Sequence, residues 1–133
     1  MNHITASPTL DISHALQRVG TQTDILGECP LWDDTAQCLY WVDIRQPAIR
    51  RLRHATGEVN TWPMPELVGS IALVDDGRLL VALPSQIALF DPANGVLSAF
   101  VPSLPMPEGH RFNDGRCDAR GRFWVGSMHN ITR

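Results

Sequence analysis

The chain has 133 residues, of which 44% are hydrophobic and 19% are charged, a composition typical of one globular domain rather than a disordered segment. Its net charge is −3 and its isoelectric point is near 5.9, which gives no reason to expect binding to nucleic acid or anionic membranes. The apolar runs are too short to span a bilayer, and polar residues interrupt the first twenty positions, so we expect neither a membrane segment nor a secretory signal. The three cysteines are odd in number and form no C-x-x-C pair, which favours reduced thiols and a cytoplasmic location.

Short apolar segments separated by turn residues dominate the chain after its first twenty positions. Residues 1–20 carry no clear period, and we expect an N-terminal arm or a short strand there. From Leu26 onward, runs rich in Val, Ile, Leu and aromatic residues alternate with turn clusters, among them Asn113–Gly115, which predicts an all-β fold. The predicted strands are Cys38–Asp43, Ala48–Arg53, Val59–Trp62, Leu67–Val74, Leu79–Leu83, Ile87–Phe90, Val96–Val101 and Phe123–Gly126.

These strands repeat at a nearly constant spacing. Leu39–Val42 recurs as Leu79–Ala82 and again as Phe123–Gly126, with starting points 40 and 44 residues apart. Several short strands per repeat of about 40 residues are typical of a β-propeller, in which each blade needs neighbours to cover its faces. Residues 21–133 then supply two and a half to three blades, fewer than the four or more that close a ring. We expect a domain truncated at its C-terminus, either a fragment of a longer product or a chain that closes the ring by self-association.

The first segment with a candidate functional residue is Leu26–Asp33, which contains Glu28 between a glycine and Cys29-Pro30. A carboxylate that enters a strand at the axis of a propeller can point into the central channel and act as a hard oxygen ligand for a divalent metal. A surface acid in a turn explains the same residue, and spacing alone favours that simpler interpretation.

The second segment runs from His110 to Met128. Arg111 and Asn113 share one face of an extended stretch, while Phe112 faces the opposite way into the core. An arginine beside an asparagine offers a planar set of donors plus a group that both donates and accepts, a combination suited to sugars and carbonyls. Asn113-Asp114-Gly115 also suits a tight turn, and the pattern alone favours the turn.

Together these two segments resemble the senescence-marker-protein/gluconolactonase/regucalcin-like family, in family order and at family spacing. The specific part is Arg-Phe-Asn-Asp-Gly followed by Gly-Arg-Phe-Trp-Val-Gly-Ser-Met, and Gly-Glu-Cys-Pro-Leu-Trp supports it. The resemblance implies a six-bladed propeller with one divalent metal on its axis, which is calcium, zinc, manganese or magnesium. It implies that Glu28 is a metal ligand and that Arg111 and Asn113 bind substrate. It places the other metal ligands and the general base beyond Arg133, so no catalytic residue is expected within this chain.

The function that the resemblance implies is metal-dependent hydrolysis of a sugar-acid lactone, as in gluconolactonases, to the aldonic acid. We expect this activity in the full-length protein, with a small sugar lactone as the partner molecule and no nucleic acid or membrane. Two alternatives remain at this point: a non-enzymatic propeller that binds calcium or a sugar, and an inactive truncated fragment.

A local basic cluster comprises Arg45, Arg50, Arg51 and Arg53. The overall acidic balance argues against a nucleic-acid surface, and we expect these arginines on a solvated outer strand.

Overall fold

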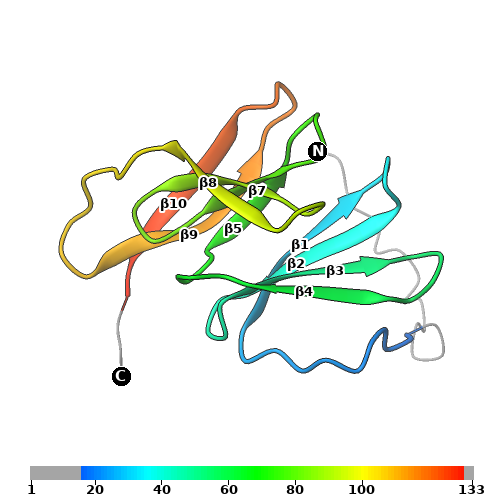
Figure 1. Cartoon of the computed structure of the whole chain (residues 1–133). Coiled ribbons are helices and arrows are strands. Elements are labelled where there is room, and N and C mark those ends of the chain that lie inside the picture. Colours follow the sequence, from blue (N-terminus) through cyan, green and yellow to red (C-terminus); the bar gives the residue numbers. More distant parts are fainter. Residues whose placement is uncertain (1–15, 131–133) are drawn as a thin grey trace, which may run out of the picture.

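The computed structural model describes residues 16–130 and is built from β-strands (Figure 1). The arm predicted for residues 1–20 therefore lies mostly outside the described residues. Within residues 16–130 there is no helix, and so none that is long and apolar enough to cross a membrane. The strands are β1 (Gly27–Asp33), β2 (Cys38–Asp43), β3 (Ala48–Arg53), β4 (Val59–Pro63), β5 (Ser70–Leu73), β6 (Leu79–Ala82), β7 (Ile87–Asp91), β8 (Val96–Val101), β9 (His110–Cys117) and β10 (Phe123–His129).

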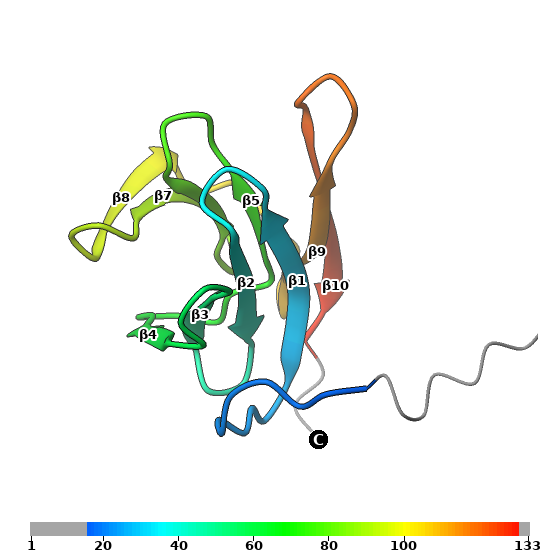
Figure 2. The same ribbon diagram turned by 90° about the vertical axis from the view of Figure 1, so that its right-hand side faces the viewer.

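The strands form three antiparallel sheets in which sequence neighbours pair. The orders are β1-β2-β3-β4, β5-β6-β7-β8 and β10-β9, so the described residues contain two four-stranded blades and two strands of a third. Figure 2 shows β1, β5 and β9 as the strands where the three sheets face one another, with β4 and β8 at the outside. The structure confirms the all-β propeller prediction and the count of about two and a half blades.

Equivalent turns explain the repeat seen in the sequence. Gly57 and Gly95 have φ of 69° and 74°, and their N–H groups donate to the carbonyl oxygens of Arg53 and Asp91, each over 2.8 Å. A left-handed backbone at the same place in both turns favours glycine. The two turns join β3 to β4 and β7 to β8, so the recurring Thr-Gly and Asn-Gly pairs mark the same position in successive blades.

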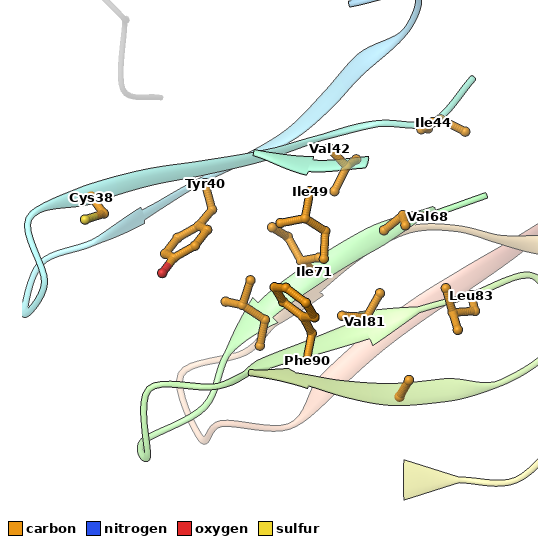
Figure 3. Close-up of a cluster of buried hydrophobic side chains, with 12 residues drawn as sticks. Cys38, Tyr40, Val42, Ile44, Ile49, Val68, Ile71, Val81, Leu83 and Phe90 are labelled. Carbon is orange, nitrogen blue, oxygen red and sulfur yellow. The ribbon is translucent and has the colours of Figure 1, made fainter. Parts of the chain in front are cut away.

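The main core lies between the first two blades (Figure 3). Ile49 from β3 and Phe90 from β7 are fully buried, and they meet Ile71 and Val81 from β5 and β6. Full burial of side chains of this size contributes roughly 1.5–3 kcal/mol each, which holds the blades face to face. A second, smaller cluster joins blade two to β9 and includes Phe112, as predicted for a side chain facing the core.

Backbone contact between blades two and three is unusually close. A Cβ placed on Gly69 would lie 2.6 Å from the carbonyl oxygen of Asn113 and 2.7 Å from that of Phe112. On the facing strand, a Cβ on Gly115 would lie 2.8 Å from Ser70 Oγ. Only glycine fits at such distances, so this pair of glycines sets how near β9 approaches β5.

The predicted set of strands lacks β1 and β9, and one turn was predicted wrongly. Part of β9 was expected only as an extended stretch that carries Arg111 and Asn113, and both strands are regular enough to pair with their neighbours. Asn113–Gly115 lies inside β9 and is not a turn; β9 turns back only after Cys117. The basic cluster is not uniformly solvated either, because Arg50 is 7% exposed and forms an ion pair with Asp24 at 2.6 Å.

Candidate functional site

A cavity of about 730 Å³ lies among the inner strands, and Glu28, Arg111 and Asn113 all line it. Its wall combines the start of β1, the connection between β2 and β3, the residues before β5, the start of β9 and the end of β10. Segments far apart in the sequence therefore meet at one end of the blades. The functional roles of these three residues stay predictions, and their placement in one cavity is what the structure adds.

A β-bulge follows Glu28 in β1. The register between β1 and β2 shifts between Glu28 and Leu31, and Cys29 within the shift has a left-handed φ of 53°. Consecutive residues of a regular strand face opposite sides of a sheet, yet Glu28 and Cys29 both line the cavity. The extra residue in β1 thus lets both Glu28 and Cys29 line the cavity, and bulges of this kind are common next to functional sites.

Cys29 also ties β1 to the next blade. Its Sγ accepts a hydrogen bond from the N–H of Ile71 at 3.4 Å and donates one to the carbonyl oxygen of Ile71 at 3.6 Å. Burial raises the pKa of the Cys29 thiol. The thiol therefore stays protonated and acts as a structural link beside Glu28.

A second bulge lies in β9. The register between β9 and β10 shifts between Val125 and Ser127, which leaves one extra residue in β9 between Phe112 and Gly115. Asn113 and Asp114, adjacent in sequence, both line the cavity as a result. The two inner strands use the same device to present consecutive side chains to one space.

Arg111 is held in place by neutral acceptors. It is 7% exposed, its Nε donates to Asn130 Oδ1 at 3.2 Å, and its Nη1 donates to the carbonyl oxygen of Phe112 and to Asn113 Oδ1, both at 2.9 Å. The bond to Asn113 occupies that side chain's oxygen and leaves its Nδ2 as a donor. Burial, followed by the nearby charge of Arg45, lowers the pKa of Arg111, which remains a cation at neutral pH.

Asp43 fixes two walls of the cavity at once. Its Oδ2 accepts the N–H of Ile25 at 2.8 Å, and its Oδ1 accepts the N–H groups of Leu26, Arg45 and Gln46 at 3.0–3.1 Å. Burial opposes ionisation of Asp43, but these backbone hydrogen bonds outweigh burial and lower its pKa. The buried carboxylate anchors both the entry to β1 and the connection between β2 and β3.

The described residues do not by themselves complete a metal site. Within residues 16–130 there is no group of three or more His, Cys, Asp or Glu side chains placed to hold a metal ion. Glu28 supplies one carboxylate to the cavity, whereas calcium takes about 6–8 oxygen ligands.

Several residues of the cavity were not predicted as site residues. Arg45, Asp114, His129 and Asn130 line it beside the predicted ones. His129 pairs with His110 across β9 and β10, with ring centroids 5.1 Å apart. No spacing in the sequence joins these two histidines, because only the strand register brings them together.

Comparison with known proteins agrees with this architecture. Residues 26–133 match the family described as the SMP-30/gluconolactonase/LRE-like region. The chain belongs to this family. The family predicted from the two motif segments is confirmed.

Members of this family with similar sequences include enzymes named for lactones. A 6-deoxy-6-sulfogluconolactonase from Pseudomonas putida is 42% identical over 88% of this chain, and an L-arabinolactonase from Azospirillum brasilense is 42% identical over 76%. Regucalcin of Gallus gallus is 29% identical over 85%. The chain spans 40%, 34% and 38% of the lengths of these three relatives.

Two solved structures share the fold. A regucalcin from Agrobacterium tumefaciens, described as a calcium-binding protein, matches with a TM-score of 0.71 and 30% identity over 81% of this chain and 37% of its own. A luciferin-regenerating enzyme matches with a TM-score of 0.72 and 29% identity over 80% of this chain and 37% of its own.

Proposed function

We propose that this chain forms part of the active site of a sugar-acid lactone hydrolase that opens the ring to the aldonic acid. The observation that supports this most is the convergence of Glu28, Arg111 and Asn113 on one cavity, from strands at opposite ends of the described chain. The lactonase names of two relatives at 42% identity support the same reaction class.

The polar groups of the cavity suit a lactone. The Oδ1 of Asn113 accepts a hydrogen bond from Arg111. Its Nδ2 remains a donor that suits a ring oxygen or hydroxyl of the substrate. Arg111 is buried and has its guanidinium plane fixed by three acceptors, so it is preorganised and loses little side-chain entropy on binding. Together the two side chains would hold the lactone in one orientation, which is how positioning lowers a reaction barrier.

Glu28 is proposed as one ligand of a divalent metal. A bound divalent ion polarises a carbonyl and lowers the pKa of water that it holds. The remaining ligands and the general base are proposed to come from blades that this chain does not contain. Determining the native mass of the protein and reading its gene past the codon for Arg133 tests that part of the proposal.

The activity test uses the protein at its native length with saturating calcium, zinc, manganese or magnesium. Hydrolysis of glucono-1,5-lactone is followed by proton release, and the proposal requires a metal-dependent rate above the spontaneous one. Glu28→Gln keeps the side-chain shape and removes its charge, so we expect metal affinity to fall at least about tenfold, as perturbed metal sites commonly show. Glu58→Gln is the matched control, because Glu58 is exposed beside the turn between β3 and β4. Equal metal affinity in wild type and Glu28→Gln would contradict the role of Glu28.

A non-enzymatic metal-binding propeller is the second candidate, because one structural neighbour is described as a calcium-binding protein. Calcium titration by calorimetry, run beside the lactone assay, separates the two. Calcium binding without hydrolysis of any sugar lactone favours this candidate, and absence of both at native length favours an inactive product.

A further inference from the structure

The cavity contains a second arginine whose role the proposed function leaves open. Arg45 lies in the connection between β2 and β3, and its side chain lines the same cavity as Arg111. The backbone that carries it is fixed, because the N–H groups of Arg45 and Gln46 both donate to the buried carboxylate of Asp43. Arg45 as a residue is exposed, so it contributes to the cavity lining from an anchored loop.

Neither arginine of the cavity belongs to an ion pair of the described structure. In residues 16–130 the ion pairs engage Arg50, Arg53, Arg78 and Arg122. The acceptors of Arg111 are a backbone carbonyl and two side-chain amides, none of which carries a charge. A nearly buried guanidinium without a counter-charge is costly unless a partner arrives from outside.

The two cations also act on each other. Burial lowers the pKa of Arg111, and the charge of Arg45 lowers it further. Glu28 and Asp114 line the cavity as well, yet Arg45 is the charged neighbour that shifts Arg111. Two like charges that face one space repel each other, and an anion placed between them relieves this repulsion.

We propose that Arg45 and Arg111 together bind an anionic substituent of the substrate, so that the preferred lactone carries a phosphate, sulfonate or carboxylate group besides its ring. This inference rests on the proposed lactonase function and names the substrate class of that site. Arg45 is then a specificity-determining residue: it contacts the charged end of the substrate and is dispensable for a neutral lactone. A planar guanidinium matches such oxyanions with paired N–H donors.

The test compares two lactones that differ in one charged group. Glucono-1,5-lactone is neutral, and 6-phosphoglucono-1,5-lactone carries a phosphate. With the metal-saturated protein at native length, we expect Arg45→Met to lower kcat/KM for the phosphorylated lactone about tenfold, the size of a lost hydrogen bond to a charged group. The value for the neutral lactone should stay within about twofold, and Arg45→Lys should recover much of the loss because it retains the charge.

Arg53→Met is the matched control. It removes the same charge from an exposed arginine at the opposite end of β3 and should leave both lactones unaffected. Added salt should raise KM for the phosphorylated lactone more than for the neutral one in wild type, and this difference should shrink in Arg45→Met. An equal effect of Arg45→Met on both lactones, or no effect on either, overturns the inference while the lactonase function stands.

A binding measurement keeps the two proposals separable. If wild type hydrolyses neither lactone, the proposed function fails, and calorimetry with glucose 6-phosphate and glucose, which differ only in the phosphate, then decides the anion site. Tighter binding of glucose 6-phosphate that Arg45→Met abolishes supports the site. Equal binding of the two sugars, or unchanged binding of both in Arg45→Met, overturns it.

Discussion

Replacing Asp43 by asparagine tests how the cavity walls are held together. Asp43 is fully buried, and its two carboxylate oxygens accept four backbone hydrogen bonds. Asparagine has nearly the same shape but only one acceptor oxygen. It therefore keeps at most the three bonds now made to Oδ1, in a weaker neutral form, and directs an amide N–H₂ at the N–H of Ile25.

The expected loss follows from the kind of bond that is changed. Hydrogen bonds to charged groups contribute about 1.5–3 kcal/mol each, and neutral ones about 0.5–1.5 kcal/mol. Weakening three bonds and leaving the part-buried N–H of Ile25 without its acceptor gives a destabilisation of about 2–4 kcal/mol. Urea denaturation followed by tryptophan fluorescence measures this difference at neutral pH. Asp75→Asn is the control, because Asp75 lies exposed in the turn between β5 and β6, and it should change stability by no more than about 0.5 kcal/mol.

The same substitution has a pH signature. Folding lowers the pKa of Asp43 below its ordinary value of about 3.9, so its ionised form stabilises the fold above that pH. This contribution is lost as the pH falls from about 4 through the lowered pKa of the folded state. Wild type should therefore lose stability in that range more steeply than Asp43→Asn. Equal stability of the two proteins at neutral pH, or parallel pH profiles between pH 5 and the acid limit of the fold, would refute the role assigned to Asp43.

Two further predictions concern β9 and its neighbours. Gly69→Ala would place a methyl group against the backbone of β9, and we expect a destabilisation of about 1–3 kcal/mol in urea denaturation. Gly126→Ala, whose Cβ would meet its nearest atom at an ordinary 3.8 Å, should cost little; equal losses in both would show that the close approach is not limiting. The pKa of Asp118 is lowered to about 2 by hydrogen bonds from the Trp124 indole, from the backbone N–H groups of Arg120 and Arg122, and from the Arg122 side chain. The stability that ionised Asp118 provides is thus lost between about pH 4 and pH 2. The indole N–H signal of Trp124 in NMR spectra should titrate near pH 2. A midpoint near pH 4, or an unchanged titration in Asp118→Asn, would count against the hydrogen bond from the indole to Asp118.

The outer parts of the blades were predictable because their patterns are local. The strands β2, β3, β6, β7 and β8 match predicted segments closely, since each is a short apolar run bounded by turn residues. The recurring glycine turns and the repeat near 40 residues already indicated the blades. The motif segments indicated the family, which residues 26–133 then confirmed.

Two of the three inner strands, β1 and β9, are absent from the predicted set of strands for a physical reason. Both β1 and β9 contain a bulge, and an inserted residue breaks the two-residue period by which strands are recognised. The sequence of β9 also contains Asn-Asp-Gly, a strong turn signal that cross-strand pairing with β10 overrides. The features that aim side chains into the cavity are thus the same ones that hid these strands.

By itself the sequence determined the all-β class and the blade repeat, because turn chemistry and apolar runs depend on near neighbours. Its resemblance to a known family, rather than any local pattern, pointed to the three candidate residues. Only the tertiary structure decided that Arg45 shares a cavity with Arg111 and that Asp43 anchors the loop that carries Arg45. Those relations depend on register and on how closely the blades approach, as Gly69 shows. Distances of that kind arise from packing between segments far apart in the chain, and no local pattern encodes them.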